Sequence, residues 1–407
     1  MYHVRLPPLA AYIVLYSTMY AAFGVASPFW PLFFESRGLS PEQLGTLLAL
    51  GTLARLVAGP LVGRVTDILG APRAVLATCA ALAVVAALGL LPAYGYVLLM
   101  ISMGQAAALA PITTIADALA LNAATGGARK PFEYGRVRGA GSAAFVVGTL
   151  IAGQVLSQTV GDLSAVVWMH AALLSGVIIG AAIVPGIAVG KTDQTQSLGA
   201  RAVMAGVQEL LRNAAFRRVI AISALVFGSH AMHDAFAVIR WNSAGISPVT
   251  ASLLWSEAVV AEIVVFFLLG PLILNRFGAR GAAALAAIAG VARWLVMSQT
   301  TELAALAAVQ PLHGFTFALL HLACMRVVGA TVPARLAATA QSIYAFGAAI
   351  ASAILSYLSG ILYGGFGAQA FLVMALLCAL SIPIALSMPH TRARIHPPSE
   401  DQAKEPS

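Results

Sequence analysis

The chain has 407 residues, of which 60% are hydrophobic and only 9% are charged, and its mean hydropathy is +0.89. A soluble domain of this length needs far more surface charge, so the composition excludes an ordinary soluble protein. The formal net charge is +8, but the basic residues are scattered among loops, which argues against a nucleic-acid-binding surface and is typical of the loops of membrane proteins.

Apolar runs recur along the chain, and each is long enough, at about 20 residues, to cross the hydrocarbon of a bilayer. Because strands of a membrane barrel are short and alternate in polarity, the pattern predicts an all-α membrane protein of about 12 transmembrane helices in two six-helix halves. In the first half, helices are expected at residues 10–34, 42–63, 73–92, 96–122, 135–158 and 164–187. In the second half, they are expected at 215–241, 250–274, 281–299, 302–328, 334–361 and 368–388.

Polar segments divide the chain into four expected regions. These are an N-terminal half (1–188), a cytoplasmic linker (189–214), a C-terminal half (215–389) and a disordered cytoplasmic tail (390–407). Lys and Arg are concentrated in alternate loops, and Arg37 and Arg240 are the loop residues that depart from this pattern. The asymmetry predicts a multi-pass protein of a bacterial-type inner membrane with both termini in the cytoplasm. We expect a monomer.

No motif for a cofactor or a metal stands out. The cysteines Cys79, Cys324 and Cys378 lie in apolar runs without pairing or metal-ligand spacing, so we expect neither a disulfide nor a metal site. Three residues, His230, His233 and Asp234, share one helical turn, which is a weak metal signal by itself. A local pair between His230 and Asp234, four residues apart, is the simpler expectation.

Two short segments repeat in register between the halves. Gly-Leu-Ser-Pro at 38–41 is matched by Gly-Ile-Ser-Pro at 245–248, and Gly-Pro-Leu at 59–61 recurs at 270–272. Parallel repeats of this kind are typical of transporters whose solute site lies between two halves near the membrane midplane.

One loop resembles the signature of the major facilitator superfamily, a G-x3-D-x2-G-x-x-R pattern. It contains Gly63, Asp67, Gly70 and Arg73, whose role in that family is structural or in gating. The counterpart at 275–280 lacks the acid. The resemblance implies the major facilitator fold, with alternating access by the rocking of two halves.

A closer resemblance covers most of the chain. Phe-Glu-Tyr-Gly-Arg-Val-Arg at 132–138 is similar to the segment that leads into helix five of the lactose permease-like proton symporters. The second half is more similar to the phenylpropionate permease family, in Ser-His-Ala at 229–231, Trp241, Ala-Glu at 261–262, Arg-Trp at 293–294, Leu-His-Gly-Phe-Thr-Phe at 312–317 and His321. The resemblance implies proton-coupled uptake of a small organic solute. Ser142 and Phe145 stand where the sugar symporters have a cysteine and a tryptophan, which argues against a galactoside.

Four ionisable residues on consecutive helices of the second half are expected at similar depth. Glu262, Arg293, His313 and His230 each lie 12 to 14 residues from the nearest cytoplasmic arginine, which corresponds to about 18 to 21 Å along a helix. Ionisable groups are costly at this depth, so each needs a function or a partner.

These residues predict a proton and solute site. Glu262 is expected to carry the coupling proton with help from His313 and Arg293, and the solute is expected to contact Arg293, His230, His313 and His321. The alternative is a permanent ion pair between Glu262 and Arg293 that only joins two helices.

The first half adds four candidates for solute binding. Asp117 and Arg138 are expected to meet near the cytoplasmic ends of their helices, as a gate, a solute contact or a structural pair. Arg55 lies in mid-helix, where it attracts an anionic solute or pairs with Asp117. Tyr20 belongs to an aromatic face of the first helix, which Pro28 and Pro31 are expected to kink at its outer end.

The sequence therefore predicts a secondary active transporter rather than an enzyme, with protons and a small solute as its partners. Because arginines outnumber acids among the residues expected at the path, an aromatic carboxylate is the first substrate hypothesis. A sugar or nucleoside proton symporter, a proton-antiport exporter of drugs or metabolites, and a non-transporting membrane sensor are the alternatives.

Overall fold

The computed structural model describes residues 6–125, 132–159, 161–185 and 200–390, and the regular secondary structure within these ranges is helical. The N-terminal half consists of α1 (Pro8–Ala26), α2 (Trp30–Ser36), α3 (Pro41–Leu69), α4 (Pro72–Gly89), α5 (Gly95–Thr125), α6 (Tyr134–Gln158) and α7 (Ser164–Ile183). After α8 (Ala200–Arg212), the C-terminal half consists of α9 (Ala214–Gly228), α10 (His230–Ser243), α11 (Pro248–Val264), η1 (Val265–Leu269), α12 (Gly270–Gln299), α13 (Leu303–Val309), α14 (Leu312–Gly314), η2 (Phe315–Leu319), α15 (Leu320–Thr331), η3 (Ala334–Leu336), α16 (Ala337–Phe366), η4 (Gly367–Ala370) and α17 (Phe371–Leu386).

The predicted all-α membrane fold of two six-helix halves is confirmed. By length and apolar composition, ten continuous helical stretches of the described chain qualify as membrane spans, and two of these, Pro248–Gln299 and Ala334–Leu386, are long enough for two crossings each. Gly278 (φ 68°) divides the first long stretch and Gly367 (φ 53°) divides the second, so twelve crossings result. Near Pro28, the first crossing breaks between α1 and α2, as the prolines predict.

The linker contains a helix that the sequence analysis did not predict. The amphipathic helix α8 packs Leu210 into the body of the protein, and Glu209 pairs with Arg335 at 2.6 Å. The expected linker residues 189–199 and the tail residues 391–407 lie outside the described residues. The four regional boundaries remain predictions.

The two repeated Gly-x-Ser-Pro segments form the same local structure. Gly38 and Gly245 have φ angles of 85° and 81°, in the left-handed region that favours glycine. Ser40 and Ser247 then cap α3 and α11, because each side chain accepts a hydrogen bond from the N–H three residues on, at 3.3 and 3.2 Å. In both, proline follows at the first helical position. The repeat therefore sets how two equivalent helices begin.

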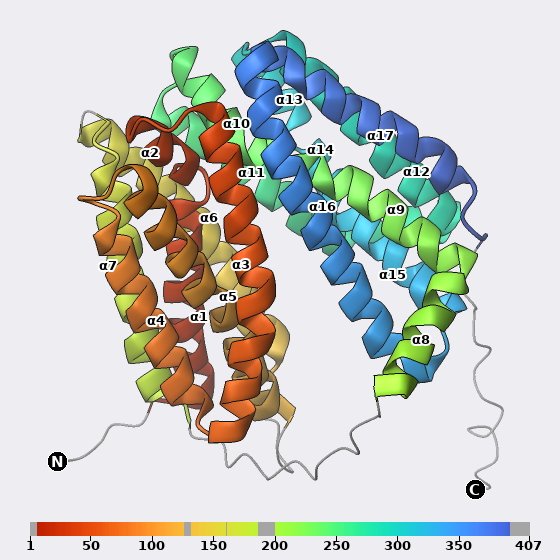
Figure 1. The fold of residues 1–407 in the computed structure, drawn as a ribbon, viewed down its shortest axis with the longest axis horizontal. Helices are drawn as coiled ribbons and strands as arrows, with labels where there is room; N and C mark the ends of the chain where they lie inside the picture. Colours follow the sequence, from red (N-terminus) through yellow and green to blue (C-terminus); the bar gives the residue numbers. More distant parts are fainter. Residues whose placement is uncertain (1–5, 126–131, 160, 186–199, 391–407) are drawn as a thin grey trace, which may run out of the picture.

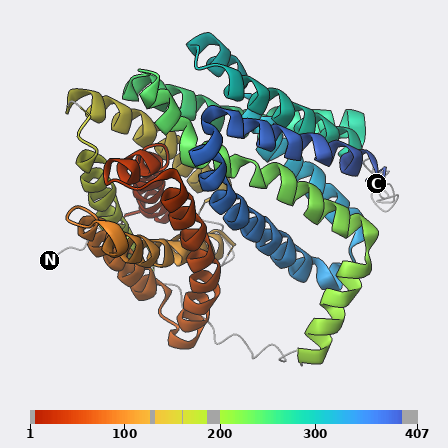
Figure 2. The same ribbon diagram turned by 45° about the horizontal axis from the view of Figure 1, so that its top comes forward.

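The halves touch at one end of the molecule and diverge toward the other, as Figure 1 and Figure 2 show. At the closed end, Gly45 of α3 crosses Gly360 of α16 so closely that a Cβ on Gly45 would lie 2.8 Å from the Gly360 Cα. A second close crossing joins Gly153 of α6 to Ser252 of α11. Small residues permit such approach of helix backbones in membranes.

Candidate functional site

A cavity of about 1020 Å³ lies between the halves. Its walls come from α1, α2, α3, α5, α6 and α7 on one side and from α10 and α16 on the other. Five aromatic side chains contribute to the walls: Phe23, Trp30, Phe34, Phe145 and Phe346. A mostly apolar cavity of this size, with a few polar groups, is typical of a small-molecule site.

Arg55 is the cationic residue in the cavity wall. It comes from the middle of α3, and its guanidinium donates a hydrogen bond to the Thr52 hydroxyl at 3.2 Å. Arg55 forms no ion pair with any carboxylate of the described residues, so the predicted pairing with Asp117 is absent there. An arginine without an acidic partner inside a membrane protein can bind an anionic ligand.

The four ionisable residues expected at similar depth lie together in the C-terminal half. Arg293 of α12 is fully buried, with 0% of its surface exposed. It contacts His313 Nδ1 at 3.1 Å, and His313 Nε2 lies 3.6 Å from Glu262 Oε2. The ring of His230 packs edge-on against that of His313 at a centroid distance of 5.1 Å. None of these four residues lines the cavity described above.

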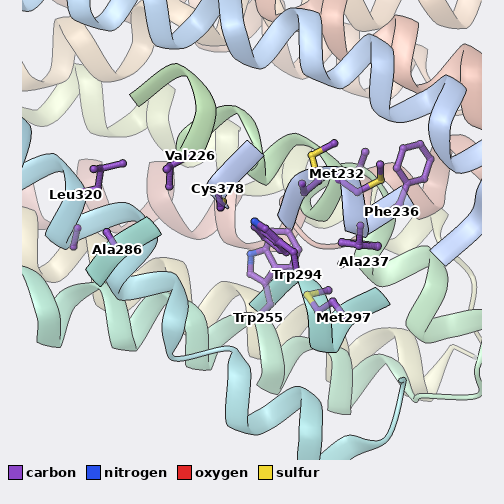
Figure 3. Close-up of a cluster of buried hydrophobic side chains, with 14 of the residues drawn as sticks. Val226, Met232, Phe236, Ala237, Trp255, Ala286, Trp294, Met297, Leu320 and Cys378 are labelled. Carbon is purple, nitrogen blue, oxygen red and sulfur yellow. The ribbon is translucent and has the colours of Figure 1, made fainter. Parts of the chain in front are cut away.

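Arg293 has two further partners that complete its surroundings. Its Nη2 group contacts His233 Nε2 at 3.2 Å and donates to Gln310 Oε1 at 2.9 Å. The guanidinium also lies over the Trp294 ring, 4.6 Å from its centroid. Trp255 and Trp294, both labelled in the buried cluster of Figure 3, each pack against the His233 ring, at centroid distances of 5.0 and 5.9 Å.

The alternative considered for Glu262 and Arg293, a direct ion pair, is not formed in this structure, where His313 contacts both residues. The expectation of a local pair of His230 with Asp234 is wrong for this structure. Asp234 instead contacts the adjacent His233 at 3.3 Å. His230 uses Nδ1 for the Val226 carbonyl and Nε2 for the Thr316 hydroxyl, at 3.1 and 2.9 Å, so no ring nitrogen remains for Asp234.

In the N-terminal half, the predicted meeting of Asp117 and Arg138 is present, with Arg138 Nη1 3.7 Å from Asp117 Oδ1. Tyr16 and Tyr134 donate hydrogen bonds to the same carboxylate oxygen at 2.5 and 2.9 Å. Tyr20 contacts Arg138 through its hydroxyl group. Two phenols and a cation hold Asp117, whereas Tyr20 orients Arg138.

The signature loop is formed at the end of the molecule where the halves diverge. Gly70 ends α3 with φ 59°, and Arg73 donates to the Val184 carbonyl at 3.1 Å, which joins the start of α4 to the end of α7. Asp67 is exposed and Gly63 has open space beside it. His321, the remaining candidate, lies 3.4 Å from the Tyr344 hydroxyl and stacks on the Phe266 ring.

Sequence reasoning missed several buried polar residues at the site. Gln310 contacts Arg293, and Gln105 and His170 line the cavity, while His233, considered only as part of a weak metal signal, also contacts Arg293. An uncharged amide or imidazole in a strongly apolar helix could have identified these residues in the sequence, because such a group also needs a hydrogen-bond partner in the membrane.

The comparisons with known proteins agree with this architecture. The model of the MFS_1 like family matches residues 9–374. The chain is 34% identical over 373 residues to the probable 3-phenylpropionic acid transporter of Escherichia coli (strain K12), a match that covers 89% of this chain and 93% of that protein.

Solved structures of transporters share the fold. The nucleoside transporter NupG superimposes with a TM-score of 0.81 at 16% identity, covering 94% of this chain and 99% of NupG. The D-xylose-proton symporter superimposes with a TM-score of 0.67 at 14% identity, covering 94% and 97%. These relatives are transporters and not enzymes, and this protein is likewise a multi-pass membrane transporter. On the extent of the family match and of the 34% identity, the chain belongs to the MFS_1 like family.

Proposed function

We propose that this protein is a secondary active symporter that carries an aromatic carboxylate, such as phenylpropionate, together with a proton across a bacterial inner membrane. Transport proceeds by alternating access, in which the two halves rock about the central cavity. The observation that carries the proposal is Arg55, a cation in the wall of an aromatic-lined cavity without a carboxylate partner among the described residues.

The cavity suits an amphipathic anion. A carboxylate group pairs with the Arg55 guanidinium, and a phenyl ring packs against side chains such as Trp30, Phe34 and Phe145. The acid in the wall, Asp234, contacts His233 and forms no ion pair with Arg55. The Escherichia coli relative, a probable 3-phenylpropionic acid transporter, supports the same class of solute.

Proton coupling is proposed for the buried cluster of the C-terminal half. Glu262 takes up and releases the proton, and His313 connects it to Arg293, the cation behind it. Protonation of Glu262 removes a negative charge near that cation, which changes the balance between conformations with different separations of the two groups. His230 and His321 are proposed to contact the solute during transport, and the Asp117–Arg138 pair to act as a gate.

The orientation follows from charge. In the predicted topology the basic residues of the loops lie mostly on one side, which includes the end of α3 and helix α8. Both lie in Figure 1 at the end of the molecule where the halves diverge. We therefore place both termini and the open end in the cytoplasm, so that this conformation faces inward.

Uptake by proteoliposomes tests the solute and the role of Arg55. Labelled 3-phenylpropionate is offered outside while a pH gradient, acid outside, is imposed. We expect accumulation above the equilibrium level in the unaltered protein and a loss of at least about tenfold in Arg55→Gln, because a buried carboxylate without its cation loses a charge-assisted bond.

Arg276→Gln is the control, since Arg276 is exposed and does not line the cavity, and the change is expected to leave uptake unchanged. Accumulation of a sugar or a nucleoside in place of the aromatic acid would overturn the proposed solute. Uptake of the acid at an unchanged rate in Arg55→Gln would show that Arg55 does not bind the solute.

A further inference from the structure

His170 of α7 is a buried polar residue at the cavity that the transport cycle above does not use. It lines the cavity and is 1% exposed. Its ring packs against Trp30, another residue of the cavity wall, at a centroid distance of 5.2 Å.

The hydrogen-bonding state of this imidazole follows from its neighbours. His170 Nδ1 lies 2.8 Å from the carbonyl oxygen of Ala22, which can only accept, so Nδ1 carries the hydrogen. In the neutral imidazole, Nε2 then has a free lone pair. Nε2 is buried and has no hydrogen-bond partner among the described residues. A buried acceptor left in this state is costly, so a bound donor would be favoured.

A second unpartnered group lies in the same wall. Gln105 of α5 is 2% exposed and lines the cavity, and its amide Nε2 has no partner in the described chain. The wall thus offers an acceptor at His170 and a donor at Gln105, beside aromatic surfaces. An unsubstituted phenyl ring satisfies neither group, whereas a hydroxyl group can donate and accept.

We propose that His170 accepts a hydrogen bond from a hydroxyl group on the aromatic ring of the solute, so that the preferred substrates are hydroxylated phenylpropionates. This inference rests on the proposed function, in which Arg55 binds the carboxylate at one end of the molecule. His170 then contacts the ring hydroxyl at the other end of the solute. Its free lone pair distinguishes a hydroxyl from a methoxy group, which accepts hydrogen bonds but has no hydrogen to donate.

Binding measurements on the purified full-length protein test the inference. The probes are 3-phenylpropionate, its three ring-hydroxylated isomers and the corresponding methoxy compounds, each titrated by calorimetry. At least one hydroxylated isomer is expected to bind about tenfold more tightly than its methoxy counterpart, the effect of one buried hydrogen bond.

Two variants separate the nitrogens of the ring. His170→Asn keeps an amide near the Nδ1 position, where it can still donate to Ala22, but has no acceptor at the Nε2 position, so the preference should disappear. His170→Gln places an amide oxygen near the Nε2 position and should retain part of the preference. The readout is the ratio of hydroxyl to methoxy affinity within each variant, and the unfolding midpoints check that both variants fold.

The outcomes are distinguishable. If no aromatic acid binds, the proposed function itself fails. Two outcomes would leave the proposed function intact but contradict the role of His170. One is binding of aromatic acids with no preference for hydroxyl over methoxy, and the other is a preference that persists in His170→Asn. If His170→Asn does not fold, His170→Gln decides: a preference that persists in part supports the proposal, and one that is unchanged from the unaltered protein or entirely lost contradicts it.

Discussion

Within the described residues, Arg293 is linked to Glu262 and Asp234 through histidines and forms no direct ion pair with a carboxylate. His313 accepts from Arg293 at Nδ1, so in the neutral ring its Nε2 carries the hydrogen and faces Glu262. His233 accepts at Nε2 and turns Nδ1 toward Asp234. The cation therefore fixes the tautomers of two histidines on two helices. A charge change at Glu262 acts on Arg293 through an oriented imidazole rather than through a direct ion pair.

Glu262→Gln should abolish accumulation of the solute driven by a pH gradient, because an amide cannot take up the coupling proton. Counterflow, in which external solute exchanges with preloaded solute, should remain within about threefold of the unaltered rate, since Gln preserves the shape and one acceptor. Both are measured in proteoliposomes.

Glu257→Gln serves as the matched control, because Glu257 lies on the same helix α11 and contacts neither His313 nor Arg293. It should accumulate solute normally. Full pH-driven accumulation by Glu262→Gln would exclude Glu262 as the proton carrier.

At the scale of helices, two π-helical segments lie beside the proposed proton site. Glu262 precedes η1 by three residues, and His313 precedes η2 by two. In addition, Gly314 approaches the backbone of Ala261 so closely that a Cβ would lie 2.6 Å from the Ala261 oxygen. Irregular turns of this kind are frequent at functional sites. They allow the two helices to bring Glu262 and His313 together.

Gly45→Ala should disturb the closed end, where α3 crosses α16. The added methyl group meets the backbone of Ser356 and Gly360, at 2.6 to 2.9 Å, so the helices must separate. Overpacking costs about 1 to 3 kcal/mol, which shifts the population between conformations by about tenfold and slows transport. Counterflow rates measure the change.

Gly59→Ala tests the same substitution on the same helix where a Cβ has no neighbour within 4 Å, and it should transport normally. Equal rates in the two variants would show that the crossing at Gly45 does not limit the conformational change.

At the scale of the whole molecule, the arrangement of the halves leaves one end of the cavity open. The wall residue Ser356 lies at the crossing, and Ser342, 14 residues earlier on α16, lies about 21 Å nearer the open end. The native cysteines Cys79, Cys324 and Cys378 are buried. An introduced cysteine therefore reports on accessibility with little background.

Ser342→Cys should react with a membrane-impermeant maleimide in inside-out vesicles and much more slowly, by about tenfold or more, in right-side-out vesicles. A saturating solute should slow the reaction by filling the cavity. The unaltered protein is the control for background labelling. Reaction only in right-side-out vesicles would reverse the proposed orientation.

The apolar runs were sufficient to predict the helical membrane fold and its twelve crossings. Length and polarity decide which segments cross a bilayer, and these are local properties of the chain. The equivalence of the two Gly-x-Ser-Pro segments was also predictable from the sequence. A glycine with positive φ, a serine cap and a proline at the first helical position all act within a few residues. The depth of each residue along its helix also predicted that Glu262, Arg293, His313 and His230 lie at a similar level.

Which of these residues touch was decided only by the tertiary structure. Depth does not specify the rotation of a helix about its axis, so the sequence did not reveal that His313 separates Glu262 from Arg293 or that Asp234 turns to His233. The cavity also depends on how the two halves pack and diverge, and so does the placement of Arg55 and of the unpartnered His170 Nε2 in its wall. Helix formation follows from local hydrogen bonds and from transfer into the membrane, whereas contacts between helices depend on side-chain packing among residues far apart in the chain.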